Sequence, residues 1–134
     1  MSNEQIRPEV GKYPLIFGGD NYPNLQVILL RIGSLEDNQY VLKLSGIDHP
    51  WDGHFFDLTR DGDDRRANYA MNTPPDGEYN LMTCRDNWGG LSYEIYLQGI
   101  RDGIRLYPGN GSYLNAEHLL TEYLQYKEEG KKPF

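Results

Sequence analysis

The feature that most constrains the fold is a succession of short apolar or alternating runs between residues 13 and 107, separated by glycine, proline, asparagine and aspartate. This succession is typical of antiparallel strands joined by tight turns. Several connections contain Asp-Gly pairs, which favour the positive φ angles of tight hairpins. We therefore expect strands over residues 25–32, 40–45, 54–59, 66–71, 78–84, 91–98 and 104–107.

Two of these runs differ in how they should be buried. Residues 25–32 carry apolar side chains on both alternation sets, so this strand should be covered on both faces. Residues 91–98 are apolar on one set only, which is typical of a half-buried strand. A second layer must therefore cover the outer face of residues 25–32.

The end of the chain changes from a strand period to a helix period. The apolar positions Ala116, Leu119, Leu120, Tyr123 and Leu124 form one helical stripe. Asn115 is suited to cap the helix, and Gly130 lies where it should end. The expected fold class is α+β: a mainly antiparallel curved sheet of six to eight short strands, for which a partial barrel is plausible, with one C-terminal amphipathic helix packed on it.

The 134 residues suffice for one domain with a proper core, so we expect a single domain over residues 1–134, with flexible tails at 1–11 and 130–134. The single cysteine, Cys84, has no partner for an internal disulfide, which favours a reducing compartment. The first residues have no apolar leader segment, and the longest apolar run, residues 27–30, is too short to cross a bilayer. These features predict a cytoplasmic protein without a membrane partner.

The formal net charge of −7 disfavours nucleic acid as a partner, because phosphate binding needs clustered lysine and arginine. A more basic protein is the partner that this charge favours, although an acidic soluble protein needs no such partner.

One loop combines metal-binding residue types within seven positions: Asp48, His49, Asp52 and His54. Imidazole and carboxylate groups together suit a divalent metal such as zinc, which would generate the nucleophile of a hydrolase or lyase. The spacing is not diagnostic, and a solvated turn has the same composition. The third histidine, His118, is expected on the exposed side of the helix, with Glu122 one turn further on.

Other candidate motifs are incomplete. The aspartates at residues 57–64 lack the distal glutamate of a calcium loop, and Arg65 and Arg66 fit a hairpin tip with compensated charges. The glycine-rich residues 18–20 and 109–112 lack the lysine of a phosphate-binding loop. Cys84 falls in a predicted strand and no serine lies in a nucleophile elbow. Without a complete catalytic set, we expect a non-catalytic protein without a cofactor.

Large aromatic residues concentrate in or beside the turns. Tyrosine and tryptophan are enriched in protein interfaces, where they act as anchors. The leading hypothesis is a small acidic binding protein that docks a more basic protein, in the manner of an inhibitor, an immunity protein or an antitoxin; a groove for a sugar or other ligand would use the same aromatic residues. The predicted binding residues are Trp51, Trp88, Tyr22, Tyr107 and Tyr113 as aromatic contacts, and Asp61, Asp63 and Asp64 as rim charges.

Overall fold

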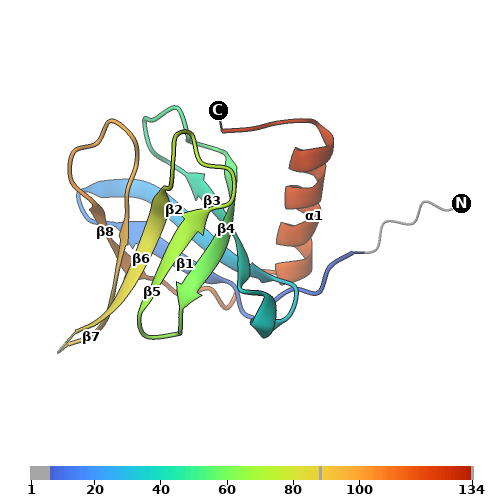
Figure 1. Ribbon diagram of the computed structural model, residues 1–134, viewed down its shortest axis with the longest axis horizontal. Helices are drawn as coiled ribbons and strands as arrows, with labels where there is room; N and C mark the ends of the chain where they lie inside the picture. Colours follow the sequence, from blue (N-terminus) through green and yellow to red (C-terminus); the bar gives the residue numbers. More distant parts are fainter. Residues whose placement is uncertain (1–6, 88, 134) are drawn as a thin grey trace, which may run out of the picture.

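The computed structural model describes residues 7–87 and 89–133, which form a β-barrel with one helix beside it (Figure 1). A short 3-10 helix, η1 (Leu35–Asp37), joins the second and third strands. The other elements are β1 (Leu15–Gly19), β2 (Tyr22–Ile32), β3 (Gln39–Ser45), β4 (Phe55–Gly62), β5 (Ala67–Met71), β6 (Asn80–Asn87), β7 (Gly90–Ile95), β8 (Ile104–Pro108) and α1 (Ala116–Glu128).

The barrel is closed, with each strand antiparallel to its neighbours in the order β1 to β8. Closure depends on β1, which pairs with β2 on one side and with β8 on the other. In the closing ladder Phe17 faces Pro108, and Gly18 faces Tyr107. The expected α+β class, the antiparallel sheet and the strand number are therefore confirmed, whereas the expectation of a partial barrel is wrong. Closure leaves no unpaired sheet edge, which is a common solution to the edge-strand problem.

The barrel interior is filled by apolar side chains. Leu42, Leu58 and Met82 are fully buried there, and Tyr69 and Cys84 also belong to this cluster. An eight-stranded barrel is just wide enough for its own side chains to fill it. Among the described residues no polar or charged residue is buried. A binding site must therefore be sought on the outside of the barrel.

Helix α1 packs against the outer face of β1 and β2, as the two-sided pattern of β2 predicts. Val27 and Leu29 point into the barrel, whereas Ile28 and Leu30 pack outside it against Leu120 and its neighbours on the helix. Figure 1 shows the helix standing beside the barrel as a second layer. Both the helix and the face it covers are therefore confirmed.

The ends of α1 follow the sequence signals. The side chain of Asn115 accepts a hydrogen bond from the backbone N–H of His118 at 3.0 Å, which satisfies a donor of the first turn. The helix stops at Glu128, and Gly130 has a φ of +73°, a left-handed conformation that suits glycine. No helix in the described part of the chain is long and apolar enough to span a membrane.

The predicted tails are only partly outside the described residues. Residues 1–6 and 134 lie outside them, whereas residues 9–11 pair with the end of β2. The N–H of Gly11 donates to the carbonyl of Arg31 at 2.9 Å, and the N–H of Gly33 donates to the carbonyl of Glu9 at 2.6 Å. Glu9 also forms an ion pair with Arg31. These contacts attach residues 9–11 to the barrel.

Candidate binding site

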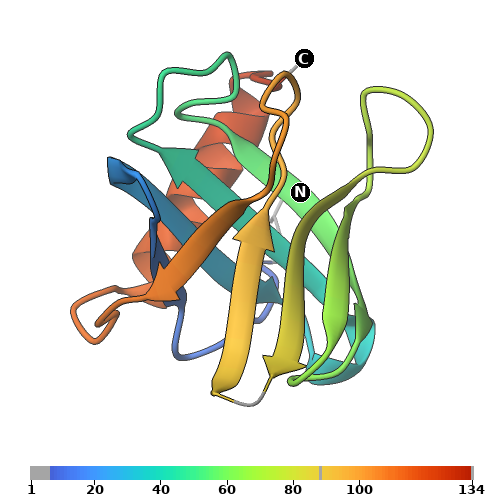
Figure 2. The same cartoon turned by 90° about the vertical axis from the view of Figure 1, so that its left-hand side faces the viewer.

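The connections of the barrel gather at two opposite ends (Figure 2). Because consecutive strands alternate in direction, alternate loops lie at the same end. We call one end the acidic end; its loops are residues 20–21, 46–54, 72–79 and 96–103. The other, which we call the paired end, is formed among the described residues by 33–38, 63–66, 89 and 109–115.

The two ends differ in charge. The acidic-end loops contain six carboxylates and one cation, Arg101, so their formal net charge is −5 with histidine neutral. The loops of the paired end have a net charge of −2, because Asp63 and Asp64 are balanced by Arg65 and Arg66. Most of the chain's net charge of −7 thus lies on one end. The six carboxylates are those of Asp20, Asp48, Asp52, Asp76, Glu78 and Asp102.

Most of these acidic-end carboxylates have no partner. Within residues 7–87 and 89–133, only Asp52 among the six accepts a side-chain hydrogen bond, from the backbone N–H of Ile47 at 3.3 Å. The ion pairs of the described chain lie on other surfaces. The negative charge of the acidic end is therefore not neutralised by the part of the chain that the structure describes.

The largest acidic-end loop, residues 46–54, closes the barrel mouth. Trp51 is 3% exposed, and its ring lies 5.4 Å from that of Phe56 and 5.7 Å from that of Tyr79, centroid to centroid. The loop turns tightly at Gly46, whose φ is +82° and where an added Cβ would lie 1.8 Å from the carbonyl oxygen of Asn24. Trp51 was predicted as an interface anchor; its ring instead fills the core and offers no surface to a partner.

The four predicted metal ligands in this loop are not brought together. No group of three or more His, Cys, Asp or Glu side chains suited to a metal occurs among the described residues, which include all four. Both ring nitrogens of His49 are occupied: Nε2 lies 2.6 Å from the carbonyl oxygen of Gln98, and Nδ1 accepts from the N–H of Trp51 at 3.0 Å. His54 is directed elsewhere, with Nδ1 2.8 Å from the hydroxyl of Tyr126 on the helix. These contacts give the two histidines structural roles in the loop and at the helix.

A low apolar ridge lies at the acidic end, formed by Tyr22 and Ile100. Both side chains are partly buried and pack on the barrel core. A hollow of about 490 Å³ on one side has mixed charge, with Asp20, Asp102, Arg101 and Arg105 in its wall. The hollow on the other side, about 380 Å³, has Asp48 as its single charged lining residue. Ile47 and Pro23 complete the apolar wall of this second hollow.

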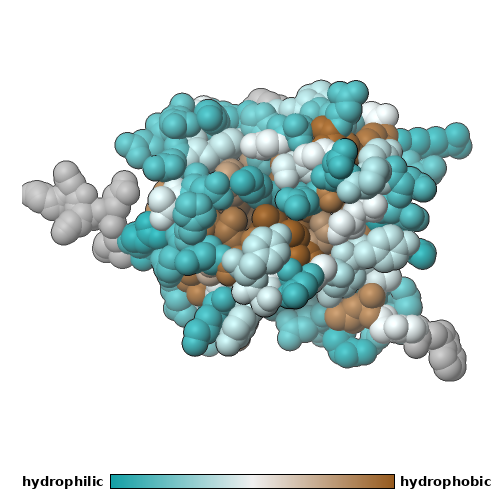
Figure 3. Space-filling model, turned by 180° about the vertical axis from the view of Figure 1, so that it is seen from behind, coloured by the Kyte–Doolittle hydropathy of each residue, from teal (hydrophilic) through white to brown (hydrophobic). Residues whose placement is uncertain are grey.

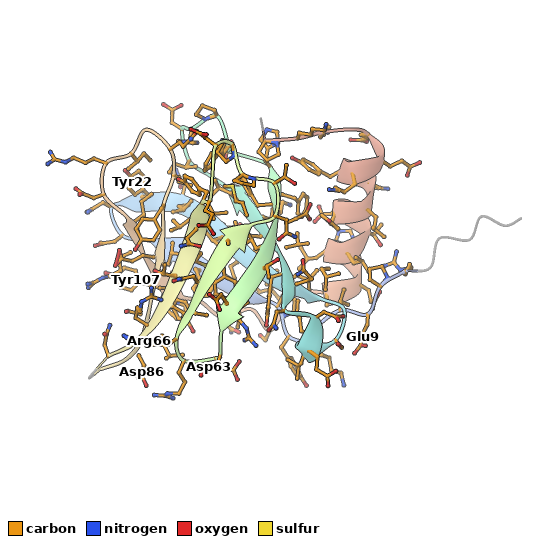
Figure 4. The ribbon with its side chains drawn as sticks, viewed as in Figure 1. Glu9, Tyr22, Asp63, Arg66, Asp86 and Tyr107 are labelled. Atoms are coloured by element: carbon orange, nitrogen blue, oxygen red, sulfur yellow. The ribbon has the colours of Figure 1, made fainter. Side chains whose placement is uncertain are left out.

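The predicted rim aspartates lie at or beside the paired end: Asp63 and Asp64 are in its loop 63–66 and interact with the chain's own arginines and backbone, whereas Asp61 is on the adjoining end of β4. Asp61, Asp63 and Asp64 are all exposed. Asp64 forms an ion pair with Arg60 at 2.9 Å. Asp63 accepts from the N–H groups of Arg65 and Arg66 at 2.9 and 3.0 Å, and these bonds lower the pKa of its carboxyl. Figure 4 shows Tyr22 at one end, with Asp63, Arg66 and Asp86 at the other.

A neighbouring ion pair strengthens this pattern at the paired end. The guanidinium of Arg65 binds Asp86 through two hydrogen bonds, of 2.8 and 2.9 Å, and this contact lowers the pKa of the Asp86 carboxyl. Two parallel N–H···O bonds are the strongest geometry for an arginine–carboxylate pair. The sequence suggested that Arg65 and Arg66 compensate the aspartates of their own hairpin tip; instead Arg65 pairs with Asp86 on β6, and Asp64 pairs with Arg60 on β4.

The remaining predicted aromatic contacts are divided between surfaces. Tyr107 and Tyr113 are 49% and 69% exposed, on β8 and in the connection to the helix. Trp88 lies outside the described residues. The structure therefore keeps Tyr22 at the acidic end and places Tyr107 and Tyr113 elsewhere.

A further cavity of about 230 Å³ lies between β4 and the C-terminal part of α1. Asp57 in its wall accepts hydrogen bonds from the hydroxyl of Tyr123 and, at 2.9 Å, from Nζ of Lys127. Burial and the nearby Asp57 raise the pKa of Tyr123, so this hydroxyl stays protonated as a donor. These contacts attach the helix to the barrel.

Cys84 is buried, and burial raises the pKa of its thiol, as expected for a structural cysteine. His118 is exposed, as predicted.

Comparison with protein-family models, with curated proteins and with solved structures finds no match to this chain. Its function must therefore be argued from its own surfaces. Sequence reasoning missed the acidic end, although the signal was present: in a barrel of sequential hairpins, alternate loops share an end, so their charges can be summed directly from the sequence.

Proposed function

We propose that this protein is a non-catalytic binding protein whose acidic end docks a more basic protein. The observation that carries the proposal is the net charge of −5 on the four loops of that end, where five of the six carboxylates have no partner among the described residues. An asymmetric field of this kind steers a partner of opposite charge and speeds its encounter.

The hollow beside Asp48 defines what the partner would insert. A lysine or arginine side chain has an apolar stem and a charged head, and long basic side chains lay their stems along apolar surface. In this hollow the stem would contact Tyr22 and Ile100, and the head would meet the unpaired carboxylate of Asp48. Tyr22 thereby keeps the role predicted from the sequence.

The filled barrel supports a role in binding over a role in catalysis. Catalytic sites use a few polar groups that converge in a concave pocket. In the described chain no polar residue is buried in the barrel, and the histidines of loop 46–54 are engaged in structural contacts. Inhibitors, immunity proteins and antitoxins are binding proteins that act by covering a partner's surface, and we place this chain in that functional class.

Affinity capture with two matched charge reversals tests the proposal. Asp48→Lys changes the acidic end, and Asp61→Lys changes the end of β4 beside the paired end by the same charge. Both aspartates are exposed, and neither forms a side-chain hydrogen bond or ion pair among the described residues. We expect the same basic protein to be retained by the wild type and by Asp61→Lys, and lost with Asp48→Lys. Retention of one partner by all three baits, with both variants folded, would contradict the proposal.

A further inference from the structure

A separate hollow, of about 400 Å³, lies on the outer face of β1 and β2, and Tyr22 and Ile100 do not line it. We call it the β1 groove. Its volume is within the range of about 300–1,000 Å³ that is typical of small-molecule sites. The described residues that line it include Ile16, Gly18, Asn24, Gln26, Asn110 and Tyr113.

The groove exists because of two features of β1 and β2. On β2, Gln26 lies opposite Gly18 and Tyr22 lies opposite Gly19. Residues 23–25 of β2 therefore have no ladder partner on β1 and form a β-bulge beside the groove. At Gly18 the outer face carries no side chain, and an added Cβ would meet no atom within 4 Å. A glycine inside a strand often marks a place where a ligand approaches the backbone.

The lining is free of charge, although a quarter of the chain's residues are charged. Its polar side chains are the amides of Asn24, Gln26 and Asn110, each of which offers both donors and an acceptor. Among the described contacts, Asn24 and Gln26 form no side-chain hydrogen bond, and Asn110 uses only its Oδ1, which accepts from the N–H of Ser112 at 3.0 Å. Amide donors and acceptors therefore remain available to a ligand.

Two exposed tyrosines stand at the groove. Tyr113 lines it and is 69% exposed. Tyr107 is the ladder partner of Gly18, and opposite residues of an antiparallel pair project from the same face, so its side chain borders the open space at Gly18. Figure 3, seen from behind, shows hydrophobic residues exposed within a hydrophilic surround on that side of the molecule. Tyrosine rings combine an apolar face with a polar hydroxyl.

We infer that the β1 groove binds a neutral saccharide. A sugar ring presents an apolar C–H face, which can lie on a tyrosine ring, and a rim of hydroxyl groups, which pair with amides. The absence of cations from the lining disfavours phosphate, sulfate and carboxylate ligands, and the absence of carboxylates disfavours amines. The groove shares Pro23 and Asn24 with the hollow beside Asp48, but Gly18 and Tyr113, on which this inference is tested, do not line that hollow.

The experiment screens the wild-type protein against immobilised neutral, sialylated and sulfated oligosaccharides, and then titrates the best neutral disaccharide by NMR. We expect a neutral glycan to bind with a dissociation constant of about 1 mM or tighter, as suits a shallow site. Gly18→Leu should fill the groove and Tyr113→Ala should remove its ring, and each should weaken binding by about tenfold or more. The control Tyr13→Ala, at a tyrosine that is 82% exposed and not part of the lining, should leave binding unchanged.

Three results would overturn the inference: no neutral glycan producing a shift, preferential binding of sialylated or sulfated glycans, or binding that survives both Gly18→Leu and Tyr113→Ala. Gly18→Leu tests the groove without disturbing the barrel, because Gly18 does not have the positive φ that L side chains avoid and its Cβ position is open. The NMR spectrum of each variant also reports whether it is folded.

Discussion

The two ends of the barrel are both built from loops between antiparallel strands, but they differ in whether their carboxylates have partners within the protein. At the paired end, Asp63 accepts hydrogen bonds from backbone N–H groups of its own hairpin, and Asp86 pairs with Arg65 of the neighbouring hairpin. At the acidic end, the buried ring of Trp51 packs loop 46–54 onto the barrel core, and five of the six carboxylates there have no partner among the described residues. Carboxylates that have no internal partner and lie on a well-packed loop are available to a binding partner, whereas carboxylates that are paired internally stabilise the fold.

The largest effect on stability should come from the loss of the buried Trp51 side chain. Trp51→Ala leaves a cavity beneath loop 46–54, and loss of a large buried aromatic side chain costs about 3–5 kcal/mol of the free energy of unfolding. At the paired end, Leu35→Ala removes a side chain that is 60% exposed, and we expect a change within about 0.5 kcal/mol. Urea denaturation of the two variants measures the contrast. Similar losses in both would show that loop 46–54 is not a packed support.

A smaller effect, on the melting temperature, should distinguish the charged residues of the two ends. Arg65→Ala removes the two-bond pair with Asp86 and should lower the melting temperature slightly, more at low salt than at 1 M salt, since salt screens exposed ion pairs. The triple change Asp20→Asn, Asp48→Asn and Asp102→Asn removes repulsion between carboxylates and should leave the melting temperature unchanged or slightly raised. Thermal scans at both salt concentrations measure these shifts. A marked loss of stability in the triple variant would mean that the acidic-end carboxylates serve the fold.

The smallest effect is the dependence of stability on pH through Asp63 and Asp86. Hydrogen bonds from the backbone of residues 65 and 66 lower the pKa of Asp63, and Arg65 lowers that of Asp86. A carboxyl whose pKa is depressed by folding adds stability above its ordinary value of about 3.9, and this contribution disappears as the pH falls through the folded-state pKa. NMR titration of the side-chain carboxyl carbons should therefore give midpoints below about 3.9 for both residues. Ordinary midpoints for both would show that the contacts of the paired end are not maintained in solution.

Much of the fold could be predicted because local patterns determine it. The two-sided apolar pattern of β2 and the helical stripe after Asn115 together place α1 on the sheet. Closure could not be predicted, since it depends on β1, a five-residue strand ending in two glycines, and on its pairing with Pro108. Neither feature gives a sequence signal, because ladder partners far apart in the chain are chosen by tertiary packing.

The site was only partly predictable for a related reason. A turn-like segment indicates where a residue lies along the chain, but it does not indicate which way its side chain points. Trp51 was predicted as an exposed aromatic residue and is buried, whereas Tyr113 is exposed, although both lie in loops. The acidic end becomes visible once the loops are assigned to ends, and that assignment requires only the strand order.

The most direct test of the acidic end is a titration of ¹⁵N-labelled protein with a lysine octapeptide at low salt, followed by amide chemical shifts. The account predicts that the largest shifts occur in residues 20–22, 46–54 and 96–103, that residues 63–66 change little, and that Asp48→Lys weakens the response while Asp61→Lys does not. Shifts spread evenly over both ends, or centred on residues 63–66, would contradict the claim that the acidic end is the binding surface.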